Sequence, residues 1–141
     1  MIDTPSYQII PVLMGGTITD VTEKTVKINL TGRLGVLVIS RQFLDIEPVT
    51  RYTTVRFYFS YLWAEPQSWE YELLPLQQEG GLVPHLLGGV LTEVNDTAVK
   101  AMLPQRAGTI AVPLRWVFTS LVLTPGQQVS FYMSRIQKKT D

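Results

Sequence analysis

The chain contains no cysteine, which excludes disulfide bonds, thiolate zinc sites and cysteine nucleophiles. Its single histidine, His85, would have to carry any serine–histidine relay or histidine-based metal site alone. No apolar run reaches the roughly 20 residues that a membrane-spanning helix needs. The first ten residues also lack the basic and apolar regions of a secretory signal peptide. These absences predict a cytoplasmic protein without a membrane segment.

The chain also has no net charge, because 12 basic residues are balanced by 12 acidic ones. Non-specific nucleic-acid binding depends mainly on basic residues that neutralise phosphates, so nucleic acid is an unfavoured partner. Hydrophobic residues make up 45% of the 141 residues, which is enough for a folded domain and argues against disorder.

An internal repeat is the strongest feature of the sequence. A shift of 73 positions aligns residues 10–44 with residues 83–117 without a gap, and 11 of the 35 pairs are identical. The identical pairs include three glycine pairs and Arg33/Arg106. After a one-residue slip, VRFYFS (55–60) aligns with VSFYMS (129–134). This agreement predicts two copies of one module, that is, a tandem duplication.

Each copy has the pattern of short β-strands. TVKINL (25–30) and AVKAML (98–103) alternate, which predicts that Val26, Ile28 and Leu30 share one face, as do Val99, Ala101 and Leu103. Alternation in TTVRFYFSYLW (53–63) likewise assigns Val55, Phe57, Phe59, Tyr61 and Trp63 to one face. The order of strands and hairpins predicts a small closed β-barrel in each copy, since closure removes exposed edges.

The predicted domain organisation is therefore a first β-barrel repeat over 1–63, a connecting segment over 64–81 and a second barrel over 82–141. The connecting segment supports two interpretations. Trp69, Tyr71 and Leu73 alternate like an edge strand, whereas Ser68 followed by Glu70 and Glu72 is typical of a short helix that Pro75 would end.

The pattern GG-x-[IL]-T-[DE]-V, followed by a hairpin, R-x-G-x-[LI] and V-x-F-Y-x-S, resembles SH3-like, Sm-like and OB-like small barrels. It also resembles an uncharacterised family of small β-barrel repeat domains from Gram-positive bacteria. The resemblance covers residues 10–62 and 83–135 and implies a tandem SH3-like or OB-like barrel, not a chemistry. OB-like RNA-binding barrels present aromatic residues on their binding strands, but the first two strands of each copy here have none.

Few residues are suited to catalysis. The acidic pairs Asp20/Glu93 and Glu23/Asp96 recur in both copies, but they lie at strand ends and turns, where solvated charges are expected. His85 precedes the second glycine pair and fits a strand-entry residue better than a general base. We expect no enzyme activity, no metal and no cofactor.

Arg33 and Arg106 are the candidate binding residues. Both lie at the tip of the second hairpin, and the arginine fork suits carboxylate or phosphate groups. Together with Lys27 and Lys100 they support the alternative function, an RNA- or nucleotide-binding barrel.

Large apolar residues at positions that the repeat does not require indicate a contact surface. The candidate interface residues are Val36, Trp63, Phe118 and Leu121. The sequence therefore favours a non-enzymatic protein-binding or assembly module that forms a homo-oligomer or binds a protein partner.

Overall fold

The computed structural model describes residues 10–64, 82–104, 107–118 and 122–139. Regular structure in these ranges is almost entirely β-strand, with short 3₁₀ turns at Arg41–Phe43 (η2) and Leu114–Trp116 (η4), so the prediction of an all-β chain is confirmed. No helical element in this described part has the length and apolar character needed to cross a membrane.

The strands of the two halves follow one another in the same order. In the first half they are β1 (Val12–Val21), β2 (Thr25–Leu30), β3 (Val36–Ser40), β4 (Leu44–Asp45), β5 (Thr54–Phe59) and β6 (Leu62–Ala64). In the second half they are β7 (His85–Val94), β8 (Ala98–Met102), β9 (Gly108–Pro113), β10 (Val117–Phe118), β11 (Gln128–Met133) and β12 (Ile136–Lys138).

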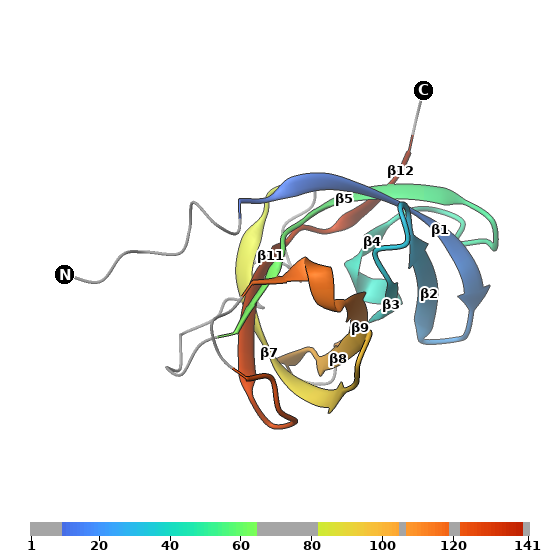
Figure 1. The fold of residues 1–141 in the computed structure, drawn as a ribbon. Coiled ribbons are helices and arrows are strands. Elements are labelled where there is room, and N and C mark those ends of the chain that lie inside the picture. The colour runs from blue at the N-terminus through green and yellow to red at the C-terminus, as the bar shows by residue number, and fades with distance from the viewer. Residues whose placement is uncertain (1–9, 65–81, 105–106, 119–121, 140–141) are drawn as a thin grey trace.

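All twelve strands of the described residues belong to one sheet, in the order β10-β6-β11-β7-β8-β9-β3-β2-β1-β5-β12-β4. An additional pairing joins β5 to β11 at Phe59 and Met133. The strands from β11 to β5 therefore form a closed ring of eight. Figure 1 shows the sheet curving round, with β5 and β11 side by side although they come from opposite halves of the chain.

This sheet corrects the expectation that residues 1–63 and 82–141 form two separate barrels. β3 pairs with β9, β6 pairs with β10 and β11, and β12 pairs with β4 and β5, so each half provides strands to the other. A half on its own would leave these strands with unpaired backbone groups, and pairing between the halves satisfies them.

The core has the alternation that the sequence predicts. Val26, Ile28 and Leu30 are buried, and so are Val99, Ala101 and Leu103. The largest fully buried side chains include four phenylalanines, listed in chain order as Phe43, Phe57, Phe59 and Phe131.

The prediction for the end of the long strand is wrong. β5 ends at Phe59, and when the strand structure resumes in β6 it is Leu62 and Ala64 that are buried, whereas Tyr61 is exposed. Ser60 causes the change of phase, because its hydroxyl accepts the N–H of Tyr132 at 2.8 Å and donates to the Tyr61 carbonyl at 3.0 Å. These bonds interrupt the alternation and direct the chain towards the other half.

Two glycines allow the halves to approach closely. A Cβ atom on Gly35 would overlap the carbonyl oxygen of Ala111, and one on Gly108 would overlap that of Val38. The repeated glycine of the R-x-G motif is thus required where β3 and β9 meet.

Candidate functional site

Three aromatic side chains, which we call the aromatic cluster, gather on the surface: Tyr61, Trp116 and Phe118. The Tyr61 ring stacks on Trp116 with centroids 4.1 Å apart, and Phe118 lies 6.2 Å from Tyr61. Tyr61 is 38% exposed and Phe118 is 43% exposed. The cluster therefore keeps substantial apolar area in contact with water.

Residues of both halves hold the cluster in place. The Nε1–H of Trp116 in η4 donates to the Ser60 carbonyl at 2.9 Å, and its ring also stacks on buried Phe59, with centroids 6.3 Å apart. Phe118 lies beside Trp63, because β10 and β6 are parallel partners. The rings are thus fixed in position by backbone pairing and by the core beneath them.

The equivalent positions in the other half have a different chemistry. Phe43 corresponds to Trp116, Asp45 to Phe118 and, after the one-residue slip, Arg135 to Tyr61. Arg135 contacts the Asp45 carboxylate from Nε at 3.0 Å and from Nη2 at 2.9 Å, and Nη2 also donates to the Gln42 carbonyl at 2.7 Å. Phe43, the equivalent of Trp116, is wholly buried.

The contrast defines what the aromatic cluster can do. An arginine–aspartate pair with a further carbonyl bond is satisfied within the chain. The exposed rings of Tyr61 and Phe118, with partly buried Trp116 between them and the core, instead supply area for contact. Aromatic rings of this kind are the usual anchors of protein interfaces. The cluster offers a contact surface, not a set of reactive groups.

A second, smaller apolar feature lies on the outer surface of β7 and β8. Val90 and Met102 are cross-strand partners, 39% and 42% exposed, beside a shallow hollow of about 200 Å³. At the equivalent positions the first half has Thr17 and Asn29. This pair provides a comparison surface for tests of the aromatic cluster.

The predicted interface residues occupy different places. Phe118 belongs to the aromatic cluster, and partly buried Trp63 lies next to it. Val36 is partly buried on β3, where it pairs with Ala111 of β9, so it lies at the junction of the halves. Leu121 lies outside the described residues.

The structure describes only one residue of the predicted arginine pair. Arg33 is an exposed turn residue with a φ of 58°, and its carbonyl accepts a bond from Arg115 Nη2 at 3.1 Å. Arg106 lies outside the described residues.

The remaining candidates lie in strands and turns. His85 begins β7, and no group of three potential metal ligands occurs within the described ranges. Asp20 and Glu93 are register partners of Lys27 and Lys100, which is a favourable cross-strand arrangement of charges.

Tyr61 is the functional candidate that sequence reasoning missed, since strand alternation assigned it to the core. The repeat contained a signal that Tyr61 is not a core residue, because the residue equivalent to Tyr61 in the second half is Arg135. A position occupied by arginine in one copy rarely faces an apolar core.

No protein-family model matches this sequence, and no curated protein sequence matches it either.

Proposed function

We propose that this chain is a non-enzymatic assembly module that self-associates by packing its aromatic cluster against a second copy. The observation that carries this proposal is the difference between equivalent positions, where Arg135 and Asp45 bond to each other and Tyr61 and Phe118 are exposed. The ion pair satisfies its groups within the chain, whereas the rings retain apolar area for a partner.

We also propose that the fold arose by duplication and forms one barrel from two half-barrels. The pairing of β3 with β9 supports this. If each residue of the pair Val36–Ala111 is replaced by its equivalent in the other half, the pair becomes Thr109–Val38, and both pairs occur in the structure. The Tyr58 N–H bonds to Ser134 Oγ at 2.8 Å, and the equivalent Tyr132 N–H bonds to Ser60 Oγ at 2.8 Å. The ring of eight paired strands, with its large side chains buried, supports a barrel, since eight strands enclose a space that side chains can fill.

A second copy is the partner that the cluster suits best. The cluster carries no charge, so a partner should present apolar area of similar extent, and a two-fold contact supplies the same three rings from the other copy. Burial of one exposed side chain of this size stabilises by roughly 1.5–3 kcal/mol. The exposed Tyr61 and Phe118 rings of two copies would therefore offset a substantial part of the cost of association.

The test is light scattering across a concentration series of the full chain and of the double variant Tyr61→Arg/Phe118→Asp. This variant introduces the residues that form the ion pair at the equivalent positions, so it removes the apolar area and retains a plausible local structure. We expect the wild type to approach twice its 15.9 kDa mass as concentration rises and the variant to stay monomeric.

The matched control is Val90→Thr/Met102→Asn, which makes an equally exposed apolar pair resemble its equivalents in the first half. This control should self-associate like the wild type. A wild type that is monomeric at every concentration, or a control that loses association as fully as the cluster variant, would contradict the proposal.

The alternative function, RNA or nucleotide binding, gains one supporting observation. Exposed tyrosine and phenylalanine rings are suitable platforms for stacking bases, although zero net charge opposes phosphate binding. Single-stranded RNA should therefore bind weakly at about 150 mM salt. Tight binding that both Tyr61→Arg/Phe118→Asp and Arg33→Ala weaken would favour this alternative.

A further inference from the structure

The halves meet where β3 pairs with β9, which we call the seam, and at two junctions made by short strands. At the polar junction, β12 of the second half pairs with β4 of the first. At the aromatic junction, β6 of the first half pairs with β10 of the second. The two junctions occupy equivalent positions in the sequence repeat, so their side chains can be compared one by one.

The seam does not distinguish one half from the other. Val36 pairs with Ala111 and Val38 pairs with Thr109, and each of these pairs is the equivalent of the other. One repeated glycine from each half allows the same close approach of the two backbones. Two copies of the first half, or two copies of the second, would therefore offer the same backbone pairing at the seam.

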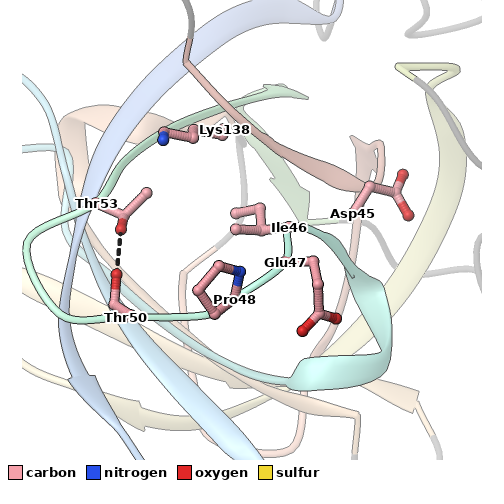
Figure 2. A pocket seen from close by; sticks show the side chains of 7 residues that line it. All are labelled: Asp45, Ile46, Glu47, Pro48, Thr50, Thr53 and Lys138. Atoms are coloured by element: carbon pink, nitrogen blue, oxygen red, sulfur yellow. Dashed lines mark hydrogen bonds between the residues drawn. The ribbon is translucent and has the colours of Figure 1, made fainter.

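The polar junction contains an ion pair. The Asp45 carboxylate lies 3.0 Å from Nε and 2.9 Å from Nη2 of Arg135, and Arg135 is only 8% exposed. Figure 2 shows this carboxylate pointing away from Lys138, the exposed lysine at the end of β12. The register partner of Asp45 is Gln137, another polar residue. The buried guanidinium is stable here because a carboxylate of the other half lies against it.

The aromatic junction has rings at the same positions. Phe118 stands in place of the aspartate, Tyr61 in place of the arginine and Trp63 in place of the glutamine. The ring centroids of Tyr61 and Phe118 are 6.2 Å apart, and Trp63 is the register partner of Phe118. Each junction thus joins side chains of matching chemistry, one set from each half.

Pairing of identical halves would mix the two chemistries. Two first halves would place Tyr61 against Asp45 at both junctions, and two second halves would place Arg135 against Phe118. The carboxylate would lose its cation in the first case, and the buried guanidinium would lose its carboxylate in the second. Removal of one member of a buried ion pair is strongly destabilising, so both identical pairings are disfavoured.

The matched pairing is not restricted to the two halves of one chain. The chain passes from the first half to the second between β6 and β7, and the pairings at the seam and at both junctions all join one half to the other. A second copy therefore presents a partner half with the same complementary junctions. Exchange of an identical element between protomers in this way is domain swapping.

We propose that the chain binds a second copy by exchanging halves, and that the two junctions select the pairing of a first half with a second half. The inference rests on the equivalence of the halves proposed above, and not on packing of the exposed aromatic cluster. Modules joined by a short connection meet at an effective concentration on the order of 1 mM, so exchange becomes appreciable when the protein folds at a comparable concentration.

The test uses introduced cysteine pairs, because the chain has no cysteine of its own. Register partners in a sheet lie within the Cα separation that a disulfide requires. A mixture of Val36→Cys and Ala111→Cys chains reports pairing of a first half with a second half. A mixture of Val36→Cys and Val38→Cys chains reports two first halves, and one of Thr109→Cys and Ala111→Cys chains reports two second halves, by the equivalence of these positions.

Each mixture is unfolded in guanidinium, refolded at about 1 mM total chain and then oxidised. We expect a disulfide-linked heterodimer from the first mixture and about tenfold less from the two mixtures that report identical halves. The Val36→Cys/Ala111→Cys double variant is the control for disulfide geometry, and it should form the bond within one chain. Absence of a link between chains in the first mixture, when this control forms its bond, would overturn the exchange of halves.

A second background tests the junctions. Tyr61→Arg/Phe118→Asp gives both junctions the same ion pair, so identical halves become matched and their two reporters should rise towards the level of the first mixture. Equal linkage of all three mixtures with wild-type junctions, or no rise in this background, would overturn selection by the junctions. Because the reporters lie at the seam, dimers held by the aromatic cluster leave them unlinked, so failure of either proposal can be recognised separately.

Discussion

At the scale of single residues, the two halves place different residues at the same left-handed backbone position. The chain must enter the left-handed region just before β5 and β11, so that an N–H can reach the carbonyl of Ile18 or Leu91. The second half uses Gly126 with a φ of 89°, which costs glycine little. The first half uses Tyr52, which is 71% exposed and whose ring lies 5.1 Å from the Arg51 guanidinium. The core does not require this tyrosine.

We therefore expect Tyr52→Gly to raise the free energy of unfolding by about 1 kcal/mol. Relief of the backbone strain stabilises the folded state by roughly 1–3 kcal/mol. Glycine also makes the unfolded chain more flexible, and this entropy offsets part of the gain. Urea denaturation measures the difference. Tyr52→Ala is the matched control, because it removes the ring and keeps the strain. If both variants are equally stable, the backbone at Tyr52 is not strained.

At the scale of elements, the short strands β6 and β12 bind the halves together. Each follows a serine, Ser60 or Ser134, whose hydroxyl accepts a backbone N–H of the other half and donates to the next carbonyl of its own. Each strand then pairs with a short strand of the other half, β10 or β4, and buries one large residue, Leu62 or Ile136. Strands of three residues are stable here because their apolar side chains enter the shared core.

Leu62→Ala and Ile136→Ala should accordingly destabilise the protein by similar amounts. Both side chains are fully buried, and removal of such a side chain costs about 2–5 kcal/mol. Gln137→Ala, on the outward side of the same strand, should change the stability by less than about 0.5 kcal/mol. Thermal unfolding of the three variants gives the comparison. A loss confined to one of the buried positions would mean that β6 and β12 are not equivalent.

At the scale of the whole molecule, the sheet makes the two halves one folding unit. The pairings β3–β9, β6–β10, β12–β4 and β5–β11 all join residues of different halves, and buried residues of both halves form a single core. Neither half can keep these backbone bonds alone, so partial unfolding of one half would expose core residues of the other.

The full chain should thus unfold in one cooperative transition. Tryptophan fluorescence, which reports on all three tryptophans, Trp63, Trp69 and Trp116, and far-ultraviolet circular dichroism should give the same midpoint in guanidinium. Single-tryptophan variants, with the other tryptophans changed to phenylalanine, test each half separately. Two separated midpoints would indicate that the halves unfold independently.

Local pattern was sufficient to predict the all-β class and the inward residues of the early strands. Val26, Ile28 and Leu30 are buried because alternation assigns every second side chain of a strand to one face, whatever the partner strand is. The same reasoning identified Phe118 as a large apolar residue outside the repeat pattern, and it is exposed.

The choice of strand partners was decided only by the tertiary structure. Two similar halves present the same edges and the same alternation, so the sequence does not distinguish pairing within a half from pairing between halves. Pairing between halves closes the ring, moves Tyr61 to the surface and brings Arg135 to Asp45. These contacts join residues more than 50 positions apart, and their free energy depends on packing that no local window of the sequence contains.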